Sequence, residues 1–236
     1  MGWHRELLIG FDLETTGTDP SEARIVTGAV IEVKDGETLG RRTWLADPGV
    51  PIPAEAVAVH GITNERAAAE GSPAADVADA LADVLTSYWQ SGVPVVAYNA
   101  VFDLSLLSAE LRRHGLRSLR DRLGGIDPGP VIDPYTIDRS VDRYRKGKRN
   151  LEAVCKEYGV LLESAHDAAA DAQAAARLAC AIADRHPKVA SLGPAELHRS
   201  QIGWYAEWAA DFQSFLRKKG KADAVVDGVW PLREAG

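Results

Sequence analysis

Asp12 and Glu14 stand on either side of Leu13, directly after an apolar run. Alternate residues of a β-strand point to the same face, so the two carboxylates would lie about 6–7 Å apart on one side of a strand. Acids that project from a buried strand are costly unless a cation compensates them. An Asp-x-Glu triplet is usually a solvated strand edge, but this context favours a site for a hard divalent cation.

Three further residues could join such a site. Asp103 falls in the first turn of an expected helix, where the helix macrodipole alone would favour an acid. His166 and Asp171 lie five residues apart near the start of an alanine-rich helical segment. Residues five apart on an ideal helix point about 140° away from each other, so a shared site requires His166 at or before the helix start. The spacing therefore predicts a histidine that is free to move.

Three ordered motifs carry a resemblance. They are residues 11–17 (FDLETTG), residues 99–103 (NAVFD) and residues 166–171 (HDAAAD). Together they resemble the exonuclease motifs of the DEDDh-type, DnaQ-like family of 3′→5′ exonucleases, to which the proofreading epsilon subunit of bacterial DNA polymerase III belongs. The resemblance spans about residues 6–185.

This resemblance implies a metal-dependent enzyme that removes nucleoside 5′-monophosphates from the 3′ end of single-stranded DNA, in proofreading or repair. The four acids Asp12, Glu14, Asp103 and Asp171 would hold two divalent ions, Mg²⁺ or Mn²⁺, because carboxylates are the ligands that such ions prefer. His166 would be the general base. The substrate contacts that the resemblance implies are Thr15, His60, Asn99 and Phe102.

Two basic tracts bear on the substrate. A net charge of −7 first argues against a nucleic-acid partner. Residues 139–149, however, carry six Arg or Lys against one Asp, and residues 112–122 carry five Arg against one Asp. Such runs are often solvated loops. With an exonuclease site nearby, Lys146, Lys148 and Arg149 become candidates for neutralising the phosphates upstream of the cleaved bond.

The elements that position these residues follow from periodicity. Strands are expected at 7–13, 25–33 and 37–47, with a hairpin turn at 35–36, and short strands at 94–98 and 131–133. Helices are expected after 73 up to about 92, from a cap at Asn99 to Gly115, and around 136–144, 150–158 and 164–185. The pattern predicts an α/β domain with a mixed sheet. The resemblance implies an RNase-H-like exonuclease fold with five strands in the order 3-2-1-4-5, flanked by helices.

The C-terminal part departs from the resemblance. Pro187 and residues 191–194 (SLGP) predict a boundary between an exonuclease domain, 1–186, and a helical appendage, 187–236. The appendage carries an aromatic stripe at helical spacing: Ile202, Tyr205, Trp208, Phe212 and Phe215. The stripe indicates either a helix packed on its own domain or a docking surface. Residues 213–216 (QSFL) do not predict sliding-clamp binding, because two cations follow where a hydrophobic anchor is required.

The composition limits the classes of protein to which the chain can belong. Hydrophobic residues make up 46% of the chain, yet no apolar run approaches the roughly 18 residues of a membrane span. The N-terminus does not resemble a secretion signal, and Cys155 and Cys180 lack metal-ligand spacing. A cytoplasmic protein with buried thiols and no membrane partner is expected.

Two other functions stay open: an exoribonuclease for short RNAs that uses the same five residues, and a non-catalytic nucleic-acid-binding module. A DNA polymerase partner, a free-standing role and the oligomeric state also stay open.

Overall fold

A mixed sheet forms the centre of the fold. The structure is a computed structural model that describes residues 2–233. Strands β1 (Leu7–Thr15), β2 (Ile25–Lys34) and β3 (Glu37–Asp47) form an antiparallel meander, and β5 (Val95–Val96) and β6 (Val131–Ile132) add parallel strands beside β1. The order is β4-β3-β2-β1-β5-β6. The five predicted strands thus stand in the predicted order, and the two-residue strand β4 (Ser72–Pro73) extends the sheet to six.

The two faces of the sheet carry different helices. Ile9, Phe11 and Leu13 of β1 share one hydrophobic cluster with helices α3 (Ala74–Gln90) and α4 (Ala100–Arg113). Leu8 belongs to the opposite cluster, which contains helix α8 (Ala168–Arg185). Because side chains alternate along a strand, the even-numbered residues of β1 face α8. Asp12 and Glu14 are therefore on the α8 side of the sheet.

A glycine lets α8 approach β1 closely. A Cβ atom added at Gly10 would lie 2.2 Å from the carbonyl oxygen of Ala172, a distance that real Cβ atoms do not adopt. The side chains of α8 that face the sheet are mostly alanines, which are short enough for a close contact. Ala172, Ala176 and Ala179 are fully buried. The close approach holds the first turn of α8, which carries Asp171, against the strand that carries Asp12.

Several expectations about helices need correction. The last helix of the domain begins at Ala168 and not at 164, because Asp167 caps it by accepting hydrogen bonds from two backbone N–H groups. Helix α6 (Pro134–Val141) starts two residues earlier than expected and stops at Val141, since Asp133 is its cap. The side chain of Asn99 makes no capping hydrogen bond to α4. The remaining helical elements are η1 (Trp3–Arg5), α1 (Ala54–His60), α2 (Asn64–Glu70), α5 (Leu119–Arg122), α7 (Leu151–Tyr158) and α9 (Pro187–Ala190).

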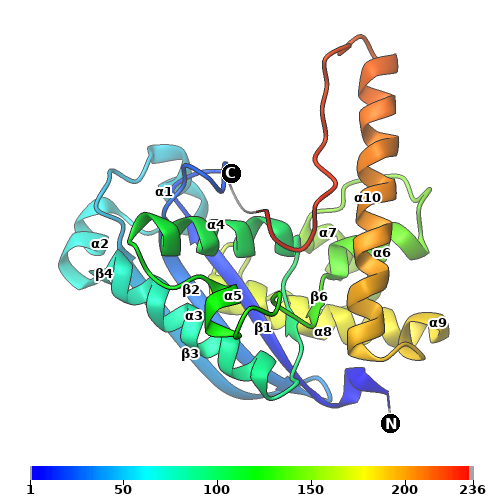
Figure 1. Cartoon of the computed structure of the whole chain (residues 1–236), viewed down its shortest axis with the longest axis horizontal. Coiled ribbons are helices and arrows are strands. Elements are labelled where there is room, and N and C mark those ends of the chain that lie inside the picture. Colours follow the sequence, from blue (N-terminus) through cyan, green and yellow to red (C-terminus); the bar gives the residue numbers. More distant parts are fainter. Residues whose placement is uncertain (1, 234–236) are drawn as a thin grey trace.

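The long helix α10 (Pro194–Lys218) stands out from the body of the molecule, and the chain then returns alongside it (Figure 1). Its lower half covers the edge of β6. Gln201, fully buried, accepts a hydrogen bond from Asp133 N at 2.7 Å and donates one to Val131 O at 2.9 Å. Trp230 of the returning segment donates to the Asp133 carboxylate at 3.3 Å. The division at 186/187 stays a prediction, but polar contacts cross it.

Two expectations from composition can be compared with the structure. Within residues 2–233, no helix is both long enough and apolar enough to cross a bilayer. Cys155 and Cys180 are free and buried, as expected.

Candidate active site

The five candidate catalytic residues meet in one hollow at the carboxyl end of β1. Its volume is about 690 Å³, and its lining includes all five: Asp12, Glu14, Asp103, His166 and Asp171. They come from β1, from the first turn of α4 and from the segment that enters α8. A smaller hollow of about 250 Å³ shares Glu14 and His166 with the first and is also lined by His60. Glu14 and His166 thus stand between the two hollows.

Asp103 ties α4 to the strand. Its side chain is 3% exposed, and its Oδ1 accepts a hydrogen bond from the backbone N–H of Leu13 at 3.1 Å. Leu13 lies between Asp12 and Glu14, so this contact brings the third carboxylate to the first two. A helix-start acid that served only the macrodipole would have no need for this contact.

His166 and Asp171 form the opposite wall. The backbone of His166 lies in the left-handed region, with φ at 66°, and its N–H donates to Asp171 Oδ2 at 3.2 Å. Its side chain is exposed and precedes the helix, as the spacing required. One ligand atom from each of Glu14, His166 and Asp171 can be chosen so that all three lie within 4.8 Å of one another.

Burial, and to a smaller extent the charge of nearby acids, favours the protonated forms of these carboxyl groups. Burial, and then the charges of Asp103 and Asp171, raise the pKa of Asp12 well above its usual range. Burial is also the main cause that raises the pKa of Glu14 to about 7 and that of Asp171 to about 6. These shifts mark acids that lack a compensating cation in the protein itself.

The donor set fits a hard divalent cation. Asp171 Oδ1 is buried and has no hydrogen-bond partner among residues 2–233. A cation would satisfy that oxygen and would lower the cost of gathering four acids. His166 could be a further ligand or a nearby base, since its ring reaches the same space.

The predicted substrate contacts are only partly gathered here. Asn99, Phe102, Lys148 and Arg149 line the main hollow, and His60 lines the smaller one. Thr15 and Lys146 do not line any described hollow, and the Thr15 hydroxyl donates to Gly17 O at 2.7 Å. Burial lowers the pKa of His60, and its Nδ1 accepts a hydrogen bond from Ile62 N.

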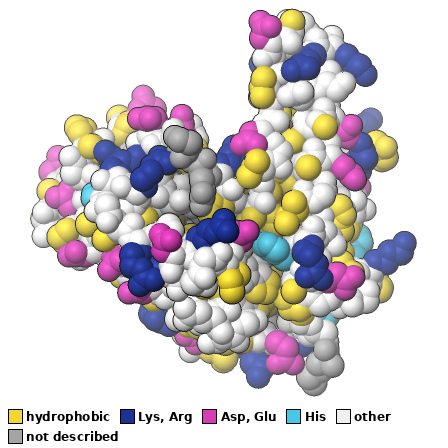
Figure 2. All heavy atoms as spheres, viewed as in Figure 1, with side chains coloured by type: hydrophobic (Ala, Val, Ile, Leu, Met, Phe, Trp, Pro, Cys, Tyr) yellow, Lys and Arg dark blue, Asp and Glu magenta, His cyan; other side chains and the backbone are white. Residues whose placement is uncertain are grey.

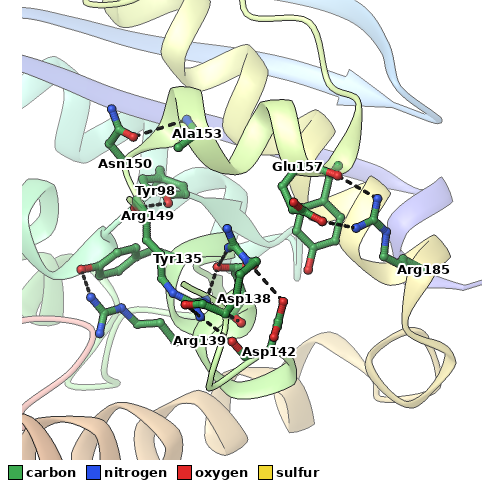
Figure 3. A network of polar contacts seen from close by, with 12 residues as sticks. Tyr98, Tyr135, Asp138, Arg139, Asp142, Arg149, Asn150, Ala153, Glu157 and Arg185 are labelled. Atoms are coloured by element: carbon green, nitrogen blue, oxygen red, sulfur yellow. Dashed lines mark hydrogen bonds and ion pairs between the residues drawn. The ribbon is translucent and has the colours of Figure 1, made fainter. Parts of the chain in front are cut away.

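Arg149 has a structural partner. Its guanidinium lies 2.5 Å from the buried carboxylate of Asp138, and its carbonyl accepts a hydrogen bond from the Tyr98 hydroxyl at 2.6 Å (Figure 3). The Asp138 charge therefore offsets that of Arg149. Of the three predicted phosphate contacts, Lys148 is the one that lines the hollow and has no ion-pair partner among residues 2–233.

Sequence reasoning missed several residues of the site. The main hollow is also lined by Tyr98, Tyr135, Arg139, Asn150 and Leu151. Asp133 was recognised only as the end of a strand, yet its Oδ1 accepts a hydrogen bond from Asn99 N at 2.9 Å. Asn99 adopts φ 63°, so this contact supports a strained residue just before α4. The sequence feature that could have identified Asp133 is its place as a carboxylate at the end of a short buried strand.

Comparison with known proteins shows the family and agrees with the fold. A family model described as an exonuclease, RNase_T, matches residues 9–179, so the chain belongs to this DnaQ-like exonuclease family. Among similar proteins, DNA polymerase III PolC-type of Listeria innocua is 30% identical over 171 residues, and that of Lacticaseibacillus paracasei is 29% identical over 174. These alignments cover 72% and 73% of the chain but 11% of each relative, so the chain spans about a ninth of their length.

Solved structures give the same fold. Exonuclease I of E. coli in complex with a dT13 oligonucleotide matches with a TM-score of 0.64 at 23% identity, over 78% of this chain and 42% of that one. Exonuclease I of Methylocaldum szegediense matches with a TM-score of 0.63 at 23% identity, over 89% of this chain and 46% of that one. At this identity the likeness concerns the fold.

Proposed function

We propose that this protein is a DEDDh-type 3′→5′ exonuclease that shortens single-stranded DNA from its 3′ end. The observation that carries the proposal is the convergence of four carboxylates and one histidine, from three separate parts of the chain, on one hollow. A non-catalytic binding module would have no use for so many clustered acids, whose charges repel one another.

Asp12, Glu14, Asp103 and Asp171 would hold divalent cations, Mg²⁺ or Mn²⁺, and two ions suit four carboxylates. When bound, the cations would make water a better nucleophile and would offset the charge on the phosphate and on the departing 3′ oxygen. The reaction adds water to the terminal phosphodiester, breaks its P–O3′ bond and leaves a nucleoside 5′-monophosphate and a new 3′ hydroxyl.

His166 would accept the proton of the attacking water. Its ring lies within reach of Glu14 and Asp171, and imidazole is the side chain that most often accepts a proton in catalysis. Phe102 would stack on the terminal base, since it lines the same hollow as the acids. Lys148 would neutralise a neighbouring phosphate.

We favour DNA over RNA as the substrate because of the names of the similar proteins. The similar proteins are named DNA polymerase III PolC-type, and the E. coli exonuclease I neighbour is in complex with a DNA oligonucleotide. The polymerase name is also the sole support for a DNA polymerase as a partner of this chain.

Incubation of the purified protein with a 5′-labelled single-stranded DNA, and with an RNA of the same sequence, tests the proposal. We expect stepwise shortening of the DNA from the 3′ end in Mg²⁺ or Mn²⁺, and slower shortening of the RNA. A chelator or Asp12→Ala should abolish it. Asp76→Ala, at an exposed acid in the first turn of α3, is the matched control and should keep full activity.

Three results would contradict the proposal. Shortening from the 5′ end would exclude the assigned polarity, and activity in excess chelator would exclude the metal site. An RNA degraded faster than the DNA would favour the exoribonuclease instead.

A further inference from the structure

A third hollow, of about 320 Å³, lies beside the catalytic one, and the two share Arg139 and Arg149 in their linings. One wall is the upper part of α10, and the other is the basic segment 139–149. We call this hollow the α10 groove. Its lining includes Arg139, Arg143, Tyr144, Trp208, Phe212 and Phe215. The groove therefore continues the catalytic hollow.

Aromatic rings form one side of the α10 groove. Trp208 and Phe212 lie 5.6 Å apart with their planes 14° from parallel, and Phe212 and Phe215 lie 6.3 Å apart at 15°. These residues follow one another at i, i+4 and i+7 along one face of the helix. Phe212 is 40% exposed and Phe215 50% exposed, and Tyr144 across the groove is 86% exposed. Flat rings that face solvent are platforms on which nucleic-acid bases stack.

Arg139 stands where the two hollows meet. Its guanidinium lies over the rings of Tyr135 and Trp208, at 4.3 and 4.2 Å from their centroids, and it donates to the Tyr135 hydroxyl (Figure 3). Its Nε is buried without a hydrogen-bond partner, and no acid among residues 2–233 forms an ion pair with Arg139. By contrast, Arg143 pairs with Asp211, and Arg149 with Asp138. Arg139 thus offers an uncompensated, preoriented cation.

The far end of the groove is also basic. Beyond Phe215 come Arg217, Lys218, Lys219 and Lys221, all exposed. Lys219 Nζ lies 5.8 Å from the centre of the Phe215 ring. Figure 2 shows Lys and Arg side chains gathered at the free end of the projecting helix. Cations at both ends of a row of rings fit a polyanion with flat bases better than an apolar peptide.

We propose that the α10 groove holds the single strand upstream of the cleaved bond. Bases would stack on the exposed rings of Phe212 and Phe215, and Arg139 would bind the phosphate that links the groove to the catalytic hollow. This inference rests on the proposed exonuclease function. The competing occupant is a second copy of the chain, because exposed rings on a projecting helix can also form a dimer interface.

Binding of oligothymidylates of two lengths tests the groove. The experiment uses the full chain with Asp12→Asn, which prevents cleavage, and fluorescence anisotropy with a strand of about twelve nucleotides and one of about three. The double variant Phe212→Ala/Phe215→Ala should bind the long strand about tenfold more weakly or worse, and the short strand less than about twofold more weakly, because only the long strand reaches the rings.

The matched control is Ile202→Ala. Ile202 lies on the same helix with a similar exposure of 42%, but it does not line the groove. It should leave both affinities unchanged. An unchanged affinity of the double variant for the long strand would overturn the inference. So would a dimer, found by analytical ultracentrifugation of the parent protein, that the double variant dissociates.

A separate measurement distinguishes this inference from the proposed function. Hydrolysis of the p-nitrophenyl ester of thymidine 5′-monophosphate requires the catalytic hollow alone. Failure of the parent protein both to hydrolyse the ester with Mn²⁺ and to shorten the 5′-labelled DNA would remove the proposed function, whatever the binding of the oligothymidylates shows. If the parent protein hydrolyses the ester, but the double variant weakens binding of the long and the short strand equally, the proposed function stands and the proposed role of the α10 groove is wrong.

Discussion

The position of His166 is compatible with two roles, as a metal ligand or as a general base. Its ring lies close enough to Glu14 and Asp171 to bind a shared cation, yet it is exposed and lies on the segment before α8. We expect His166→Ala to keep metal affinity and to lower turnover by about 10²-fold or more, as the loss of a general base does. Isothermal calorimetry with Mn²⁺ and steady-state kinetics measure the two effects. Loss of metal affinity in this variant would make His166 a ligand.

The acids of the site should make metal binding depend on pH. Glu14 has its pKa raised to about 7 and Asp171 to about 6, chiefly by burial, so both carry protons in the metal-free protein at mildly acidic pH. A cation must displace those protons. Apparent metal affinity should therefore fall as pH decreases from about 8 to 5, by roughly tenfold per pH unit for each proton displaced. Calorimetry at three pH values measures it.

The same shifts predict the stability of the metal-free protein. A carboxyl group whose pKa is higher in the folded state binds more protons when folded, so its stabilising effect is lost as pH rises through the folded pKa. The stabilising effect of protonated Asp171 is therefore lost as the pH rises to about 6, and that of protonated Glu14 as the pH rises to about 7. The rise in melting temperature caused by Mg²⁺ or Mn²⁺ should be larger at pH 8 than at pH 5.5. Equal rises at both values would mean that Glu14 and Asp171 do not release their protons over this pH range, against their raised pKa values.

At the scale of elements, the contact of α8 with β1 decides whether the site assembles. Gly10→Ala would place a methyl group 2.2 Å from Ala172 O. Overpacking of this kind costs about 1–3 kcal/mol, and more where backbone must move. Because Asp171 precedes Ala172, we expect reduced stability together with a large loss of nuclease activity. Chemical denaturation and the oligonucleotide assay report the two effects.

A second glycine gives the control for this element. Gly203 lies in α10, with no atom within 4 Å of an added Cβ. Gly203→Ala should stabilise the protein by about 0.5–1 kcal/mol, since alanine favours the helix, and should keep activity. Equal behaviour of the two variants would show that the close approach at Gly10 has no special role.

The elements differ in how far they could be predicted. Strands β1 and β2 are mostly continuous apolar runs, and α8 is rich in alanine, so these elements follow from local pattern. The start of α8 was less well predicted: the helical segment expected around 164–185 begins only at Ala168, after the capping residue Asp167. Strand β4 and helix α2 are short, and contacts with β3 hold them in place.

At the scale of the whole molecule, the C-terminal segment is joined to the sheet by buried polar groups. Removal of residues 187–236 would leave the N–H groups of Val131 and Asp133 without their acceptors on α10. Each buried group left unpaired costs about 1–3 kcal/mol. We expect the fragment 1–186 to melt far below the full chain or to aggregate, as thermal unfolding would measure. A fragment as stable as the full chain would mean that the segment is a separate appendage.

The order of residues in one strand is enough to predict the pair Asp12 and Glu14, because the two-residue period of a strand puts both side chains on one face. The sequence also shows the order of the motifs, which predicts the family and the order of the five strands. These features depend on neighbours in the chain and on a pattern that the residues carry themselves.

Folding brings further groups to that pair, and it also sets which of the nearby cations have an acid as a partner. Asp103 reaches Leu13 across 90 residues of sequence separation, and Asp171 is placed by the approach of a helix to Gly10. Arg149 is paired with a buried acid while Arg139, in the same basic tract, is not. Such outcomes depend on packing between distant segments, which no local periodicity specifies.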